Sequence, residues 1–330
     1  MAELNEASSS DGDHQHYVPQ FILRNFAAGT KKKKKAQVHV FDKHSGTNSL
    51  ERIKEVAAQP GFYDLPQSDS VSADPALTDL ENRVAPIIAG IVKENSIAQL
   101  RADDRVVLAG FCSAQMLRVP KWREHAPTLN QIAREIVSEE GGDPEAAGFP
   151  EMTEDEVRAH GVRWLRHVPE FLPYFLDKDW MLLQTRAPAS FYISDNPMTL
   201  FNDKDFGFYG NLGLTCLGIE IYLPLSSRLT LAMLCPSHRA EREALLAKVP
   251  SGVKLTPRLQ EAVSDSTRFL SAGTSGTPFA MSHANVDRLN DLQVRYSARF
   301  VYSAEANFDL VRTMLHDHPE LRAGMRMQRG

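Results

Sequence analysis

Apolar side chains recur every three or four residues through the first half of the chain, which is the period of an amphipathic helix. The clearest stripe lies within Asp79–Asn95, where five apolar residues share one helical face: Leu80, Val84, Ile87, Ile88 and Ile91. We expect Pro86 to kink this helix, because proline lacks the backbone N–H that continues the hydrogen-bond ladder. The same period predicts three more helices, over Asp103–Arg118, Trp122–Glu139 and Thr153–Asp177.

Short segments rich in β-branched and aromatic residues indicate strands. Gln37–Asp42 alternates between polar and apolar side chains, and Gly61–Asp64 is predicted as a second short strand. Later in the chain we predict four more strands, at Trp180–Thr185, Phe191–Ser194, Gly218–Leu223 and Arg228–Leu234. Only Pro224–Ser227 separates the last two, so we expect them to form an antiparallel hairpin.

Helical patterns return at Val286–Phe300 and Glu305–His316. The predicted order is a pair of short strands, a central helical block, an antiparallel sheet and C-terminal helices. This order is typical of the α+β class rather than of alternating βαβ units. Residues 1–13 are polar and are expected to form a disordered leader. We predict a single domain over residues 14–330, with a linker near 67–78 where serine, aspartate and proline are frequent.

The composition excludes some classes of protein. The formal net charge of −5 gives the molecule as a whole no attraction to nucleic acid or anionic lipid. The run Lys31–Lys35 is a local exception, which forms either a solvated loop or a loop that contacts phosphate. Three widely spaced cysteines argue against a disulfide framework and a cysteine-based zinc site. No apolar run is long enough to span a membrane, and the polar start is unlike a secretory signal. We therefore expect a cytoplasmic protein without a membrane partner.

The densest group of reactive side chains lies in residues His14–Phe26, which read HQHYVPQFILRNF. From His16 onward this segment resembles the opening motif of the protein family known as domain of unknown function 4238. The resemblance runs to about Ser303 and implies membership of a family without an established reaction. Other stretches similar to that family are Glu81, Gln115–Pro120 followed by Arg123, and Ser194–Pro197, with weaker similarity at Pro224–Ser226, Asn290 and Phe300–Ser303.

The Ser194–Pro197 stretch reads SDNP and follows a predicted strand. Proline cannot donate a hydrogen bond to a sheet, so Asp195 is expected where the strand ends. Asp195 could act there as a metal ligand, a general base or the partner of a cation, with Asn196 beside it as a binding residue. The structural alternative is an Asx-turn, in which Asp195 or Asn196 hydrogen-bonds to the local backbone.

Two arginines flank the helix break that Pro120 predicts. Gln115 and Arg118 lie three residues apart and therefore share a helix face, and Arg123 follows the break. Because guanidinium groups match the oxygens of phosphate and carboxylate, these residues could form an anion-binding corner. The alternative is a buried network in which Arg118 pairs with Glu81 or Asp195.

Histidines near the start of the chain could bind a divalent metal. His14 and His16 alternate as on one face of an extended segment, and imidazole together with a carboxylate from Glu81 or Asp195 is a suitable ligand set. The spacing is not diagnostic, because His316 and His318 repeat it near the other end of the chain. A hydrogen-bonded structural role for His16 is the alternative.

Two functions of different classes follow. The first is a hydrolase acting on a phosphate-containing substrate, with nucleic acid among the candidates. Its catalytic residues would be His16, Glu81 and Asp195, and its binding residues Gln20, Arg24, Gln115, Arg118, Arg123 and Asn196. The second is a non-catalytic anion-binding or regulatory module, in which the same residues form a structural network. The two functions differ geometrically, because a site requires these side chains to line one open cavity, with Asp195 near His16, Arg118 or Arg123.

Overall fold

The computed structural model describes residues 14–29, 35–66, 72–207, 210–249 and 254–324. The fold belongs to the α+β class, as the sequence predicted. The expected leader at 1–13 and most of the lysine run at 31–35 lie outside the described residues. Among the described residues, no helix combines the length and the apolar character needed to cross a bilayer.

The helices form a block before the larger sheet and further groups after it. The first group is α1 (Gln20–Leu23), α2 (Asp74–Glu94), α3 (Ala102–Leu117), α4 (Pro120–Arg123), α5 (His125–Glu139), α6 (Glu154–Trp164) and α7 (Val168–Leu176). The later helices are α8 (Ser237–Ala247), α9 (Pro257–Ser275), α10 (His283–Tyr296) and α11 (Asp309–Asp317). Short 3-10 helices are η1 (Arg24–Phe26), η2 (Ile53–Glu55), η3 (Leu165–His167) and η5 (Pro319–Ala323).

The described strands form three sheets. A two-stranded sheet pairs β1 (His14–His16) with β4 (Ala58–Pro60). A four-stranded antiparallel sheet has the order β3 (Thr47–Arg52), β2 (Gln37–Asp42), β11 (Phe300–Ser303) and β6 (Ile193–Ser194). A five-stranded sheet has the order β10 (Phe279–Ala280), β5 (Asp179–Gln184), β9 (Leu229–Leu234), β8 (Glu220–Ser226) and β7 (Thr199–Phe201).

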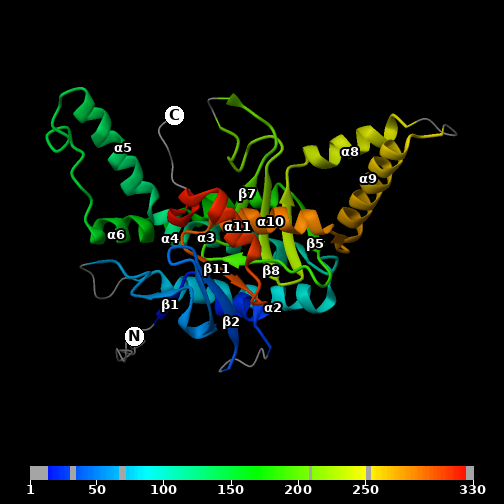
Figure 1. Ribbon diagram of the computed structural model, residues 1–330, viewed down its shortest axis with the longest axis horizontal. Helices are drawn as coiled ribbons and strands as arrows, with labels where there is room; N and C mark the ends of the chain where they lie inside the picture. Colours follow the sequence, from blue (N-terminus) through cyan, green and yellow to red (C-terminus); the bar gives the residue numbers. More distant parts are fainter. Residues whose placement is uncertain (1–13, 30–34, 67–71, 208–209, 250–253, 325–330) are drawn as a thin grey trace, which may run out of the picture.

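Figure 1 shows two helical pairs that project from the central body in different directions. The pair α5 and α6 extends on one side, and the pair α8 and α9 extends on the other. Neither α5 nor α8 contributes a buried residue, whereas every residue of β9 is buried. The core therefore lies around the sheets and the helices packed on them, with α2, α3 and α7 among these.

Several boundaries differ from the predictions. Residues Gly61–Asp64 do not form the second strand, because β2 pairs instead with the polar segment Thr47–Arg52. The helix α2 begins at Asp74, so the second half of the expected linker is helical, and Pro86 lies within α2 without ending it. Apart from these shifts, the predicted strand at Gln37–Asp42 and the β8–β9 hairpin are confirmed.

The end of the late helix was also predicted wrongly. The helix α10 ends at Tyr296, and Phe300–Ser303 forms β11 between β2 and β6. The run Phe-Val-Tyr is rich in β-branched and aromatic residues, which favour strands over helices. The larger sheet departs from a purely antiparallel arrangement in one place, because β10 pairs with β5 in parallel. The chain therefore brings its first hairpin and its last described strand into one sheet.

Candidate functional site

A polar pocket of about 390 Å³ lies where β1, α1 and α2 meet. We call it the N-terminal pocket. Its lining consists of His14, Gln15, His16, Gln20, Phe21, Arg24, Asp74, Thr78, Glu81, Asn82 and Ala85. Most of these side chains are polar, which distinguishes this pocket from an ordinary gap in the core.

The opening motif reaches the pocket through two short elements. In β1, His16 pairs with Ala58 of β4, and the hydroxyl of Tyr63 donates to the carbonyl of His16 at 3.1 Å. Helix α1 then begins after Pro19, whose extended backbone suits the position before a helix. The side chains of Ile22 and Leu23 are buried in the core. Because residues four apart share a helix face, the polar pair at positions 20 and 24 lies together on the pocket side.

Helix α2 supplies the opposite wall. Asp74, Thr78, Glu81 and Ala85 follow one another at three- or four-residue intervals, so they form a single face of the helix. The apolar face of α2 is buried through Leu77, Val84, Ile88 and Ile91. The polar stripe of an amphipathic helix is therefore the wall of the pocket.

A hydrogen-bonded chain fixes Glu81 from behind. Arg118 is 2% exposed and donates to Oε1 of Glu81 at 2.6 Å. The same guanidinium donates twice to Oε1 of Gln115, at 2.9 and 2.7 Å, and Gln115 donates to the carbonyl of Tyr17 at 2.8 Å. The network that the sequence offered as an alternative therefore exists, and its partner is Glu81 rather than Asp195.

Two side chains of the pocket lack the partners that their burial requires. The Nε2 atom of His16 is buried, and no described residue forms a hydrogen bond with it. Burial lowers the pKa of His16 below its usual value, against the opposing effects of nearby backbone carbonyls and Glu81. Arg24 is half-buried, and burial lowers its pKa as well. Its guanidinium makes one long hydrogen bond, 3.4 Å to Oε1 of Gln20, and no ion pair with any described residue.

Asp195 lies in a different environment. Its carboxylate is 1% exposed and accepts hydrogen bonds from the backbone N–H groups of Ala298, Arg299 and Phe300 at 2.7–2.8 Å. Burial raises the pKa of Asp195, although these three bonds and the charge of Lys43 oppose that rise. The carboxylate therefore holds the turn between α10 and β11.

The residues around Asp195 are equally well paired. Ser194 donates to Gln293, and the amide of Asn196 donates to the carbonyl of Tyr296 at 3.0 Å. The ammonium of Lys43 is buried and donates to the carbonyls of Val294 and Ser297, at 3.0 and 2.8 Å. Burial lowers the pKa of Lys43 to about 8. These bonds connect the β6–β7 corner to the C-terminal end of α10.

Arg123 also lies outside the pocket lining. Its guanidinium donates to the carbonyl of Phe62 and lies over the ring of that residue, 3.3 Å from the ring centroid. Burial lowers the pKa of Arg123 to about 10. Gly161 makes room for this arrangement, because a Cβ atom there would come within 2.7 Å of the Arg123 side chain. Arg123 therefore joins α4 and α6 to the segment after β4.

Comparison with known proteins identifies the family. The sequence pattern of a family described as protein of unknown function (DUF4238) matches residues 14–307. The chain belongs to the DUF4238 family. No curated protein and no solved structure matches the chain. The matched part of this DUF4238 protein contains all of the site residues that the sequence suggested, together with β11.

In this DUF4238 protein, the nine suggested residues separate into three groups. His16, Gln20, Arg24 and Glu81 line the N-terminal pocket. Gln115 and Arg118 lie behind it and position Glu81. The remaining three, Arg123, Asp195 and Asn196, contribute nothing to the lining. The pocket therefore carries only part of the predicted constellation.

Sequence reasoning missed four polar residues of the pocket, namely Asp74, Thr78, Asn82 and Gln15. The expected start of the helix at Asp79 left the first two in a linker. The spacing 74, 78, 81 and 85 could have revealed them, because it repeats with the period of a helix face.

A metal site receives little support from the geometry of the DUF4238 protein. No group of three or more His, Cys, Asp or Glu side chains in the described part of the chain could hold a metal ion. The three cysteines are all free, and Cys112 is buried.

Proposed function

We propose that the N-terminal pocket binds a small phosphate-containing ligand, with Arg24 contacting the phosphate group. One observation carries this proposal, namely a half-buried guanidinium that has no carboxylate partner among the described residues. A cation removed from water without a counter-charge is unfavourable, and a bound anion relieves that cost. The planar fork of arginine matches two phosphate oxygens at once.

The other lining residues suggest what the rest of the ligand carries. Glu81 is neutralised by Arg118 at 2.6 Å, yet its side chain keeps 26% of its exposure and can accept further hydrogen bonds. Asp74 lies in the first turn of α2, where the positive end of the helix dipole stabilises its charge. Carboxylates that line the same pocket as an arginine favour a ligand with both a phosphate and hydrogen-bond donors, such as a sugar phosphate or a nucleotide.

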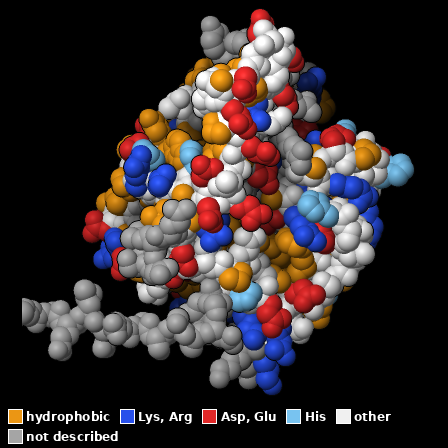
Figure 2. Space-filling model, turned by 90° about the vertical axis from the view of Figure 1, so that its left-hand side faces the viewer, with side chains coloured by type: hydrophobic (Ala, Val, Ile, Leu, Met, Phe, Trp, Pro, Cys, Tyr) orange, Lys and Arg blue, Asp and Glu red, His pale blue; other side chains and the backbone are white. Residues whose placement is uncertain are grey.

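Size and charge favour a small ligand over a nucleic acid. A cavity of about 390 Å³ is within the range of small-molecule sites. Nucleic acid binding depends on a positively charged surface. Figure 2 shows acidic and basic side chains interspersed over the face in view, and the formal net charge is −5.

Hydrolysis of the ligand is the second candidate function, and His16 favours it. Because burial lowers its pKa, the imidazole is neutral at pH 7, and its Nε2 has no partner among the described residues. A neutral imidazole can take a proton from a water molecule that attacks phosphorus, and can return that proton to the alkoxide that leaves as the P–O ester bond breaks. Arg24 would neutralise the charge that develops on the phosphate oxygens. Asp195 has no role in this proposal, because three backbone N–H groups already occupy its carboxylate.

Calorimetric titration with ribose 5-phosphate and adenosine monophosphate tests the binding proposal. We expect at least one to bind, and Arg24→Met to weaken that binding by about tenfold or more, as for loss of a charge-assisted hydrogen bond. Arg83→Met is the matched control, because Arg83 is exposed on α2, pairs with Asp79 and lines a different pocket. Equal binding by wild type and Arg24→Met would contradict the proposal.

Hydrolysis is tested separately with phosphomonoester and phosphodiester substrates, each with and without added divalent metal. If His16 is the base, His16→Asn abolishes turnover while binding in the titration persists. Elemental analysis of purified wild type and His16→Ala shows whether a metal accompanies the pocket. Binding without turnover under every condition would leave the non-catalytic anion-binding module as the function.

A further inference from the structure

A second pocket, of about 270 Å³, lies on another part of the molecule and shares no lining residue with the N-terminal pocket. Its walls come from the start of β5, the end of β9, α3, α8 and α9. We call it the β5–α9 pocket. In Figure 1, α8 and α9 lie on the opposite side of the central body from β1. The β5–α9 pocket is therefore a separate site from the proposed phosphate site.

A buried lysine is the central feature of the β5–α9 pocket. Lys178 is only 8% exposed and lines the cavity. Its ammonium group forms no hydrogen bond or ion pair with any residue that the structure describes. Lys43 is the other buried lysine in the described part of the chain, and it differs from Lys178 because its ammonium donates to two backbone carbonyls. No described carboxylate compensates the charge of Lys178 in the cavity wall, and an anionic ligand would supply the missing partner.

Further cations surround the same cavity. Arg105 lies over the ring of Trp180, 5.1 Å from the ring centroid, and has no carboxylate partner among the described residues. Arg239 lines the pocket as well, but it pairs with Asp179 at 2.9 Å. Three cations and one carboxylate therefore leave a formal charge of +2 around the cavity. Such an excess favours an anionic occupant.

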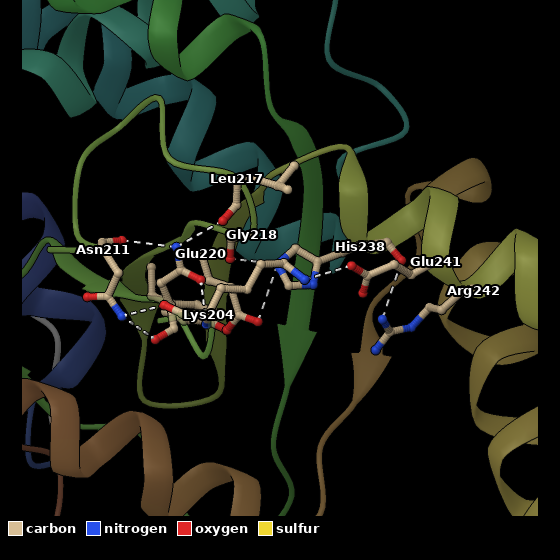
Figure 3. Close-up of polar contacts among 10 residues, drawn as sticks. Lys204, Asn211, Leu217, Gly218, Glu220, His238, Glu241 and Arg242 are labelled. Carbon is tan, nitrogen blue, oxygen red and sulfur yellow. Dashed lines mark hydrogen bonds and ion pairs between the residues drawn. The ribbon is translucent and has the colours of Figure 1, made fainter. Parts of the chain in front are cut away.

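The α8 wall of the pocket is held in place by a polar network, which Figure 3 shows. His238 lines the pocket, and its Nε2 contacts the carbonyl of Gly218 at 2.9 Å and lies 3.5 Å from the carboxylate of Glu220. One turn further along α8, Glu241 pairs with Lys204 at 2.8 Å. These contacts hold α8 against the start of β8 and the loop before it. The cavity is therefore preformed.

The remaining lining is apolar and aromatic. Trp180, Met181 and Leu234 come from the sheet, and Phe269 comes from α9. Flat rings pack well against such side chains. The volume accommodates about one or two rings with an acidic group and excludes a dinucleotide.

We infer that the β5–α9 pocket binds a small aromatic anion, a flat ring carrying one acidic group that pairs with Lys178 and Arg105. The ring lies against Trp180 and Phe269, and the acidic group supplies the counter-charge that the lysine lacks. This assignment gives the protein a second ligand site that does not depend on the phosphate proposal.

Three probes separate the parts of this inference, namely benzoate, its neutral analogue benzamide, and acetate, which lacks the ring. We expect benzoate at millimolar concentration to raise the melting temperature of the full chain by about 2 °C or more. Benzamide and acetate should have much smaller effects. Calorimetric titration with benzoate should show binding weakened by about tenfold in Lys178→Met, because the paired charge is lost.

Two variants control the experiment. Lys121→Met removes a lysine whose side chain is 14% exposed, pairs with Glu124 and lines a different pocket, so benzoate binding should persist. Arg24→Met should also leave it unchanged, which separates this site from the N-terminal pocket. Lys178→Met should fold normally, because the charge that it removes forms no ion pair with a described residue. The inference is overturned if benzoate fails to bind wild type, if benzamide or acetate binds equally well, or if Lys178→Met binds benzoate like wild type.

Discussion

The N-terminal pocket and the corner at Ser194–Pro197 contain the same kinds of side chain but differ in how those side chains are satisfied. In the corner, Asp195 accepts three backbone hydrogen bonds and is almost completely buried. In the pocket, Arg24 has no carboxylate partner among the described residues and His16 has a nitrogen without a hydrogen bond. Two motifs of one family can therefore differ in role. The hydrogen-bond and ion-pair partners of a side chain, rather than its residue type, distinguish a structural residue from a binding residue.

The largest effect is expected at the corner. Asp195→Ala leaves the three N–H groups of a partly buried turn without an acceptor, so we expect a loss of about 3 kcal/mol or more in the free energy of unfolding. Urea denaturation followed by circular dichroism measures it. Asp143→Ala is the matched control, because Asp143 also accepts a backbone N–H but is exposed, and the change should stay within about 0.5 kcal/mol. A small loss for Asp195→Ala would remove the structural interpretation of the corner.

The next largest effect is expected behind the N-terminal pocket, at Arg118. Arg118→Met removes the hydrogen-bond donor of Glu81 and Gln115. Because the Glu81 side chain is 26% exposed, water can partly replace that donor. We therefore expect a loss of about 2 kcal/mol, below the range for a fully buried pair. The same denaturation experiment on Arg268→Met, which breaks an exposed pair with Asp265, should show no comparable loss. Unchanged stability together with lost ligand binding would instead place Arg118 in the site.

A smaller, pH-dependent effect is expected at His16. Because burial lowers its pKa, the unfolded chain binds a proton more readily than the folded chain. The free energy of unfolding therefore decreases as the pH falls below about 6.5, the ordinary pKa of histidine. Denaturation between about pH 7.5 and pH 5.5 should show a shallower loss of stability in His16→Gln than in wild type. The exposed His44→Gln serves as the control, and equal slopes for wild type and His16→Gln would refute the burial effect.

The smallest effect on stability is expected at Arg24. Because no ion pair with the described residues is lost, Arg24→Met should change the free energy of unfolding by no more than about 0.5 kcal/mol. Ligand binding should nevertheless fall, as proposed above. Thermal melts of this variant with and without ribose 5-phosphate check both parts. A severe loss of stability would show that Arg24 supports the fold and would remove the contrast with Asp195.

Much of the architecture could be predicted from the sequence because it follows local periodicity. The apolar stripes of α2 and α3 and the alternation in β2 need only neighbouring residues to be recognised. β3 was missed because its residues Thr47–Arg52 are largely exposed and polar, so pairing with β2 rather than composition makes them a strand. β11 was missed because a helix and a strand lie only three residues apart, and Asp195, a hundred residues earlier, holds the turn between them.

The candidate site was predictable only in part, because it also depends on contacts between residues that are distant in the sequence. The motif at His14–Phe26 and the position of Glu81 indicated that polar groups would meet, and four of them line one pocket. The pairing of Arg118 with Glu81 was one of two partners that the sequence allowed. Nothing in a one-dimensional pattern distinguishes a carboxylate that faces three amides from one that faces a ligand, because the type of side chain is the same in both cases.

The place of β11 has a consequence for biosynthesis. This strand lies between β2 and β6, so the first hairpin cannot join the sheet until the ribosome has made residues 300–303 and released them from its exit tunnel. Until then β2 has an exposed edge that can pair with another nascent chain. Asp195 likewise waits for the amides of residues 298–300. A premature stop codon anywhere before this strand would thus remove the centre of the four-stranded sheet, and the cell would receive a chain prone to aggregation rather than a shortened functional protein.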